Sequence, residues 1–142
     1  MSELGISLVP PTLIDVIYPM CEHYILKVID RAENDISSDT TKKRLKAGET
    51  MLCVIYDDDE IIAVNILEVM EFETGHRALY IPITGGERMS EWLDDFLKLA
   101  MDIAKDLKCV ELRGISCRPG WIRALKSHGW YNINTVIGCK VE

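Results

Sequence analysis

The chain has 142 residues, of which 48% are apolar and 27% are charged, and its formal net charge is −7. This size and composition predict a single globular domain over residues 1–142. The negative net charge argues against direct binding to nucleic acid. No apolar run reaches the roughly 18 residues that a membrane-spanning helix needs. Residues 1–11 lack the basic region and apolar core of a secretory signal, so we expect no export by one.

Five cysteines are present, at Cys21, Cys53, Cys109, Cys117 and Cys139. Their odd number and the lack of any CxxC pair favour reduced thiols, as in a cytoplasm, over a disulfide framework. Cys109 and Cys117 together with His128 do not have the spacing of a zinc site, so we expect no metal.

The charge is unevenly distributed along the chain. Residues 112–141 contain no acid and five cations: Arg113, Arg118, Arg123, Lys126 and Lys140. The rest of the chain carries 11 cations and 23 acids, a net charge of −12. The basic end either faces an anion or an acidic partner, or lies against the acidic part of its own chain.

The first elements are a strand and a long helix. Residues 5–10 form a short apolar run that ends in two prolines and reads as a strand. Thr12 with Asp15 resembles a capping box. Apolar residues then recur at three- and four-residue steps as far as Ile29, which predicts a helix with one buried stripe. Pro19 lies inside this stripe and should kink or split the helix.

A short polar helix and three strands follow. Asp39 is the expected N-cap of the short helix, and Gly48 is expected to end it. Strands are predicted over residues 50–56, 61–72 and 78–84, of which the first two form a hairpin. Pro82 lacks an N–H group, so the third strand should leave the ladder there, at an edge or a bulge.

The last elements alternate between helix and strand. Ser90 is the expected N-cap of a helix that runs to Leu107 with a strong apolar stripe. Residues 109–116 read as a strand, and Pro119 begins a short helix that Gly129 closes. Residues 131–141 predict a final strand or a pair of strands.

The resulting order, β-α-α-β-β-β-α-β-α-β, predicts an α/β fold with a mixed, mostly antiparallel central sheet flanked by helices. It resembles the GNAT (Gcn5-related N-acetyltransferase) fold from end to end. The block "GWIRALKSHGW" is similar to the segment in which that family ends its last helix and enters its last strand. The stretches "LVPPTLIDVIYPMC", "LKAGETMLCVIYDDDEIIAVNILEV" and "TGGE" resemble GNAT-like proteins encoded by tailed phages and prophages.

The resemblance implies a coenzyme-binding loop before the long helix, at "PITGGERMSEW". The residues that would hold acetyl-CoA there are Thr84, Gly85, Gly86, Glu87 and Arg88. The two glycines are adjacent, whereas the family spaces them by one residue, and Pro82 stands where it has Gln or Arg. Their N–H groups either form an anion-binding nest or only make a turn, with Glu87 repelling a phosphate.

The resemblance also implies a general acid on the last helix, usually a tyrosine, but that place holds Leu125. Candidate catalytic residues are Glu71 and Glu73 as general bases, on one face of a strand with Glu68 opposite, and Tyr80 and Tyr131 as substitute acids. The alternatives are a solvated acidic edge for the glutamates and packing roles for the tyrosines. His23, His76 and His128 have no recognisable partner and read as loop or surface residues.

The basic block supplies the candidate partner-binding residues, namely Arg118, Trp121, Arg123 and Lys126. Trp121 either fills the core between splayed strands or is an exposed anchor for a partner, since Trp and Arg are favoured at interface hot spots.

Three functions remain open. The first is a non-catalytic protein that binds another phage or host protein, acidic in character, during virion assembly or DNA ejection. It would need no cofactor and would work in the host cytoplasm or in the virion. The second is an acetyl-CoA-dependent N-acetyltransferase acting on a protein or a small amine. The third is binding of another anion at the "GGE" turn, without chemistry.

Overall fold

A computed structural model describes residues 4–32, 35–115 and 118–141. The elements are β1 (Leu4–Val9), a 3-10 turn (Pro11–Leu13), α1 (Ile14–Ile29), α2 (Ser38–Lys46), β2 (Met51–Asp57), β3 (Glu60–Glu71), β4 (Arg77–Gly86), α3 (Met89–Asp106), β5 (Glu111–Gly114) and α4 (Pro119–Lys126). This order agrees with the predicted one up to the last helix. Within these residues, no helix combines the length and the apolar character needed to cross a bilayer.

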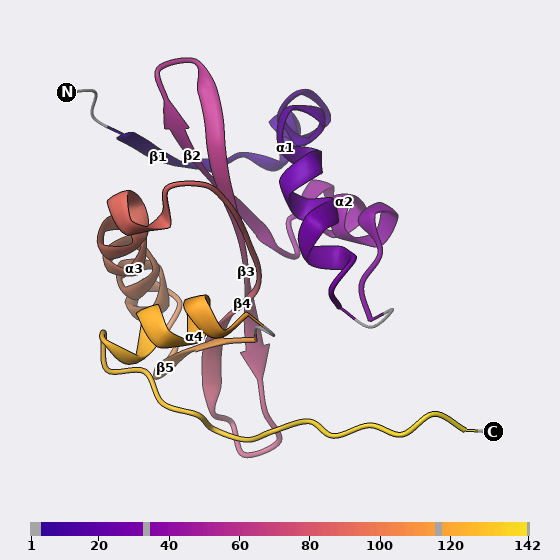
Figure 1. Ribbon diagram of the computed structural model, residues 1–142, viewed down its shortest axis with the longest axis vertical. Coiled ribbons are helices and arrows are strands. Elements are labelled where there is room, and N and C mark those ends of the chain that lie inside the picture. Colours follow the sequence, from indigo (N-terminus) through magenta and orange to yellow (C-terminus); the bar gives the residue numbers. More distant parts are fainter. Residues whose placement is uncertain (1–3, 33–34, 116–117, 142) are drawn as a thin grey trace.

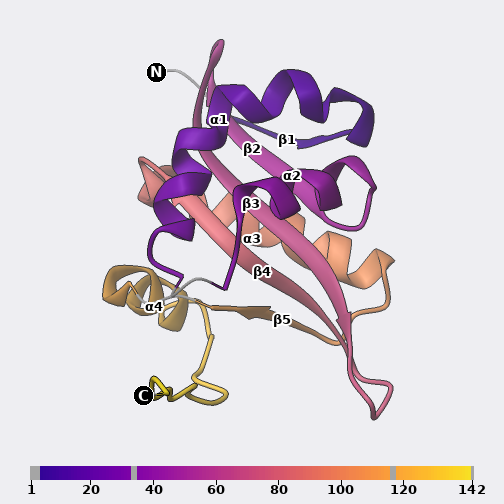
Figure 2. The same ribbon diagram turned by 90° about the vertical axis from the view of Figure 1, so that its right-hand side faces the viewer.

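The five strands form one sheet in the order β1-β2-β3-β4-β5. Every neighbouring pair is antiparallel except β4 and β5, which are parallel and connected through α3. Figures 1 and 2 show α1 and α2 on one face of the sheet and α3 and α4 on the other. The predicted fold class, a mixed and mostly antiparallel sheet flanked by helices, is therefore confirmed.

Alternation along the strands divides the buried side chains between two cores. In β2, Cys53 and Ile55 join the core on the α3 and α4 face, whereas Leu52 and Val54 join the core under α1 and α2. Because successive side chains of a strand point to opposite faces, a strand that is apolar throughout serves both cores. Each face of the sheet is thus covered by helices.

Pro82 interrupts the pairing of β4 on both of its sides, as predicted. The β3–β4 register shifts between the pair Ile66–Ile83 and the pair Glu68–Tyr80, and the parallel pairing with β5 ends at Ile81. A proline cannot donate to a ladder, so the strands separate there. Beyond Pro82, β4 keeps β3 on one side, and none of the described strands pairs with it on the other.

Two predicted helix beginnings in the first half of the chain are wrong. Thr12 lies inside the 3-10 turn that Pro11 begins, so it cannot be an N-cap, and α1 starts after Leu13 without a side-chain cap. For α2, the Ser37 hydroxyl accepts a hydrogen bond from the Thr40 N–H at 3.2 Å, whereas Asp39 lies in the first turn. A cap must precede the first helical residue, and Ser37 has the extended backbone that this position requires.

The predictions for Pro19 and Ser90 have different outcomes. Pro19 is expected to kink or split α1; the helix continues through Pro19 as one element and is not split, and Figure 2 shows its two halves running in different directions. Helix α3 is preceded by Arg88 in the left-handed conformation (φ 60°), and Ser90 is already helical. Arg88 donates hydrogen bonds to Asp57 (2.8 Å) and Glu91 (2.7 Å), which hold this uncommon backbone in place of a side-chain cap.

Both predicted glycine stops are confirmed. Gly48 has φ 76°, its N–H donates to the Leu45 carbonyl (3.2 Å), and the next N–H, of Glu49, donates to Arg44 (3.0 Å). These two bonds are the Schellman motif that satisfies the last carbonyls of a helix. Gly129 has φ 86° and follows the end of α4 in the same way.

The predicted final strand is not formed. Residues 131–141, all of which the structure describes, contain neither helix nor strand. Figure 1 shows them as an extended segment that leaves the body of the molecule, and Val136 and Ile137 are 85% and 89% exposed. Strand propensity alone cannot hold a strand, because a strand needs a neighbour to pair with.

Candidate functional site

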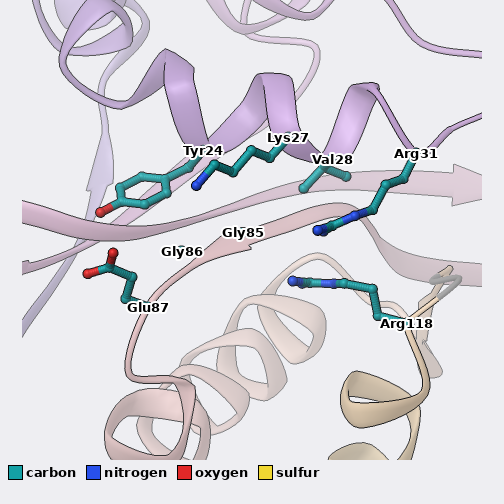
Figure 3. A pocket seen from close by; sticks show the side chains of 8 residues that line it. All are labelled: Tyr24, Lys27, Val28, Arg31, Gly85, Gly86, Glu87 and Arg118. Carbon is teal, nitrogen blue, oxygen red and sulfur yellow. The ribbon is translucent and has the colours of Figure 1, made fainter.

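A polar pocket lies at the end of β4 beyond Pro82, between this strand and the C-terminal half of α1 (Figure 3). Its volume is about 170 Å³. The lining residues are Tyr24, Lys27, Val28, Arg31, Gly85, Gly86, Glu87 and Arg118. The break in pairing at Pro82 exposes this end of β4, so the pocket follows directly from the position of the proline.

Three cations and one carboxylate line this pocket. Lys27 comes from α1, Arg31 from the turn just after it, and Arg118 from the N-cap position of α4; Figure 3 shows the two guanidinium groups turned toward each other. The Nη2 group of Arg118 donates a hydrogen bond to the Thr84 carbonyl at 3.0 Å. That carbonyl belongs to the part of β4 that has lost its parallel neighbour. The surplus of positive charge favours an anion, while Arg118 occupies part of the strand edge itself.

Both glycines of the predicted coenzyme loop are required by the packing of the chain itself. A Cβ on Gly85 would lie 2.9 Å from the Tyr24 carbonyl oxygen, because α1 crosses β4 closely there. Gly86 has φ 125°, and a Cβ there would overlap the backbone of Ile62 and Ala63. The absence of side chains at these positions therefore has a structural cause.

The residues after the glycines are also engaged within the chain. The Glu87 N–H donates to the Ile62 carbonyl (2.8 Å), and its own carbonyl accepts from the Trp92 indole (2.9 Å). The hydrogen bond from Arg88 holds the pKa of Glu91 below its ordinary value. An N–H group that is already bonded to the neighbouring strand is not available to a phosphate.

The structure separates the candidate acids and bases. Glu71 ends β3, and Glu73 lies in the following turn, so the two do not share a strand face as predicted. Tyr80 is half-buried in β4 opposite Glu68; burial, and then the charge of Glu68, raise the pKa of its phenol. Tyr131 is 73% exposed in the C-terminal segment.

These candidates do not meet the candidate coenzyme loop. Glu71 is paired with Arg77, the first residue of β4, whereas Gly86 is its last. At a rise of ~3.3 Å per residue, the two ends of β4 are roughly 30 Å apart. Tyr80 lies between them, on the far side of Pro82 from the pocket.

A second hollow lies on the outer face of α4. Pro119, Ile122, Arg123 and Lys126 line it, with a volume of about 300 Å³. The opposite face of the helix is in the core, where Trp121 is 4% and Leu125 6% exposed. Of the predicted partner-binding residues, Arg123 and Lys126 thus share one surface. Arg118 lines the other pocket, and Trp121 fills the core and presents no anchor to a partner.

Comparison with known proteins gives a match in structure alone. No family model matches the sequence, and no curated protein matches it. A predicted acetyltransferase from Clostridium acetobutylicum, solved with acetyl-CoA, superposes with a TM-score of 0.71 at 14% identity, over 97% of this chain and 96% of that one. An aminoglycoside acetyltransferase from an uncultured soil metagenomic sample, in complex with sisomicin, superposes with a TM-score of 0.71 at 11% identity, over 98% of this chain and 95% of that one. A ribosomal-protein-alanine N-acetyltransferase from Brucella melitensis superposes with a TM-score of 0.68 at 12% identity, over 98% of this chain and 100% of that one.

The chain has the GNAT fold. At 11 to 14% identity these likenesses concern the fold and not the chemistry of the individual residues. Leu125, the position at which the sequence resemblance implies a proton donor, is buried in the core and has no group that can donate a proton.

Sequence reasoning missed two of the pocket cations, Lys27 and Arg31. The apolar stripe from Leu13 to Ile29 predicts only the buried side of α1 and gives no role to either cation. No helical spacing identifies the pair, because Arg31 lies beyond the end of α1, and both residues line the pocket only through the packing of this chain segment on β4. Val28, which lies between them in the sequence, packs close to Gly85.

Two of the three histidines have partners, contrary to prediction. His76 Nε2 lies 2.8 Å from Glu111 Oε1, and His128 Nε2 contacts the carboxylate of Asp94 in α3. Cys117, one of the residues considered for zinc, lies outside the described residues. Among the residues that the structure does describe, no group of three or more His, Cys, Asp or Glu side chains could hold a metal.

The pair His128–Asp94 predicts a pH-dependent contribution to stability. The Nε2 atom of His128 faces the Asp94 carboxylate, and its Nδ1 atom lies 2.9 Å from the Ala124 carbonyl oxygen. Only the doubly protonated ring can donate a hydrogen bond to both. The hydrogen bond with Asp94, and then that with Ala124, therefore raise the pKa of His128. When the pKa of a histidine is higher in the folded than in the unfolded state, its protonation stabilises the fold. The stabilisation is complete at pH values below the unfolded-state pKa and is lost as the pH rises through the folded-state pKa. We expect His128→Gln to lower the free energy of unfolding more at about pH 6 than at about pH 8.5. Urea denaturation at both pH values measures this, and a pH-independent difference would contradict it.

Proposed function

We propose that the chain is a non-catalytic binding protein on a GNAT fold, and that it holds an acidic region of another protein against the outer face of α4. The observation that carries the proposal is the hollow lined by Pro119, Ile122, Arg123 and Lys126. It combines an apolar floor with two cations, the composition that suits an acidic partner with an apolar anchor. The sequence resemblance points to a phage protein acting in virion assembly or DNA ejection.

The charges of this face support the proposal. Arg123 and Lys126 form no ion pair with any residue in the described ranges, whereas Arg113 pairs with Glu111. The two cations on α4 are therefore not neutralised by acidic side chains of the same chain. Charges left at the rim of a hollow steer an oppositely charged partner toward it.

The end of β4 supports a role without chemistry. Arg118 bonds the Thr84 carbonyl, Glu87 uses its N–H within the sheet, and both glycines are tightly packed. These residues do not fit a loop that cradles phosphates with free N–H groups. Candidate acids and bases also lie far from this loop.

An acetyl-CoA-dependent N-acetyltransferase is the second candidate function. The observation in its favour is the pocket of Lys27, Arg31 and Arg118, whose charge suits an anionic ligand. Among the structural neighbours, the protein from Clostridium acetobutylicum was solved with acetyl-CoA.

Two measurements distinguish the candidates. A ligand that binds only the native state stabilises it and thereby raises the melting temperature. At a ligand concentration a hundred times the dissociation constant, the stabilisation is roughly 2.7 kcal/mol. We expect millimolar acetyl-CoA to leave the melting temperature unchanged, and no acetyl transfer to a panel of amines. A concentration-dependent rise together with transfer would establish the enzyme instead.

The binding role is tested with charge reversal on α4. Arg123→Glu with Lys126→Glu should abolish co-purification of the partner from phage-infected cells. Lys98→Glu with Lys105→Glu, at two exposed positions of α3, makes the same charge change elsewhere and should preserve it. Equal losses with both double variants would mean that net charge, not this face, is responsible.

A further inference from the structure

The pocket at the end of β4 has an uneven distribution of charge. Figure 3 places the hydroxyl of Tyr24 and the carboxylate of Glu87 at one end, and the guanidinium groups of Arg31 and Arg118 at the other. Lys27 projects from α1 between the two ends. Three of the lining residues are cations and one is an acid, in a chain whose formal net charge is −7. The guanidinium end of the pocket therefore attracts anions.

The two arginines belong to distant parts of the sequence. Arg31 follows the end of α1, and Arg118 is the N-cap residue of α4. α1 covers one face of the sheet and α4 the other, so the two side chains meet at the edge of β4 beyond Pro82 (Figures 1 and 2). Like charges turned toward each other repel, and an anion between them replaces this repulsion with two attractions.

The side chains at this end match a phosphate group. The guanidinium of an arginine presents its N–H donors in a planar fork that fits the oxygens of phosphate. The bond from Nη2 of Arg118 to the Thr84 carbonyl, at 3.0 Å, orients this fork, and a guanidinium has five N–H donors, more than this bond uses. Three cations and one carboxylate leave the lining a surplus of two positive charges. A phosphate ester, with a charge of about −1.5 to −2 at pH 7, balances that surplus.

Size and charge limit the ligand to one compact group. The volume of about 170 Å³ is well below the roughly 300–1,000 Å³ of pockets that enclose a whole drug-sized ligand. A longer polyphosphate would reach the carboxylate of Glu87, which repels it. The Glu87 N–H is bonded to the Ile62 carbonyl at 2.8 Å and is not available to a further phosphate. The pocket thus suits a single phosphate better than the chain of a coenzyme.

We propose that this pocket binds a phosphate dianion, as inorganic phosphate or as the phosphate group of a small ester, between Lys27 and Arg31 on one side and Arg118 on the other. Side chains hold the ion, and the backbone of the two glycines does not. The bound ion ties the end of α1 to the start of α4 and undergoes no reaction. This site is separate from the hollow on the outer face of α4, so the inference does not rest on the proposed function.

Isothermal titration calorimetry of the full chain at fixed ionic strength tests the site. Inorganic phosphate should bind saturably, and acetate should not. Lys27→Gln and Arg118→Gln should each weaken phosphate binding roughly tenfold, because they remove charged donors from opposite sides of the ion. Lys105→Gln, at an exposed position of α3, removes a charge elsewhere and should leave the affinity unchanged.

Several outcomes would overturn the proposal. These are the lack of saturable phosphate binding, equal losses in all three variants, and a loss in Arg118→Gln without one in Lys27→Gln. Lys27 is exposed and forms no ion pair with any residue in the described ranges, so Lys27→Gln should unfold like the wild type. A loss of binding in that variant therefore cannot be attributed to misfolding.

Two further titrations identify the ligand and separate the site from the others. Tighter binding of glycerol phosphate than of inorganic phosphate would assign the site to an ester, and the reverse order to the free ion. Coenzyme A should not compete with phosphate; competition that Lys27→Gln removes would show a coenzyme subsite and overturn the proposal. Arg123→Glu with Lys126→Glu should retain phosphate binding, so that failure of the partner-binding role leaves this result intact.

Discussion

Replacing Gly86 with alanine is expected to lower the free energy of unfolding by at least about 3 kcal/mol, enough to leave much of the chain unfolded. The backbone at Gly86 has φ 125°, and a Cβ there would overlap the backbone of Ile62 and Ala63. Neither group is the end of a flexible side chain, so the strand pair itself would have to separate. Chemical denaturation followed by circular dichroism measures the loss.

Gly120→Ala is the matched control, because Gly120 lies in the first turn of α4 with nothing within 4 Å of an added Cβ. It should change stability in the opposite direction, by about 0.5–1 kcal/mol. Wild-type stability of Gly86→Ala would show that β3 and β4 do not approach this closely at the pair Ala63–Gly86. A variant at Gly86 that loses an acetyl-CoA response would report on this close approach rather than on a coenzyme site.

Trp121→Ala is expected to lower the free energy of unfolding by about 3–5 kcal/mol, because it leaves a large cavity between α4 and the sheet. Trp121 is 4% exposed and belongs to the same core as Trp92 and Phe96. Urea denaturation measures the change. A loss below about 1 kcal/mol would mean that the indole is not a core residue.

The neighbouring Ile122→Ala supplies the contrast. Ile122 is 41% exposed and lines the hollow on α4, so its removal should change stability by less than about 1 kcal/mol. It should weaken partner binding in the co-purification assay instead. The comparison of Trp121→Ala with Ile122→Ala would thus separate the contribution of α4 to stability from its contribution to partner binding.

Features with a strong local cause were predictable from the sequence. Short, nearly continuous apolar runs identified β2 and β3, Pro82 indicated the break in β4, and Gly48 and Gly129 marked helix ends through positive φ. In each case one residue type or one short run is sufficient, because few conformations are compatible with it. The GNAT order of elements follows from these local signals.

Features that depend on neighbours distant in the sequence were not predictable. Arg88 replaces a side-chain cap through Asp57, which lies 31 residues earlier. The pocket joins Lys27 and Arg31 with Arg118 at the end of β4, and residues 131–141 form no strand although their pattern is that of one. Sequence period indicates which face of an element is apolar, but not which element will cover it.

The connection between β4 and β5 also has a consequence for the order of folding. β2, β3 and β4 are joined by tight turns, so their contacts close short loops, whereas β5 reaches β4 only after the whole of α3 has crossed the sheet. Short closures are entropically cheaper and form earlier. We therefore expect the meander to form first and α4 to dock last, so that the surface offered to a partner is complete only on a chain that has finished folding.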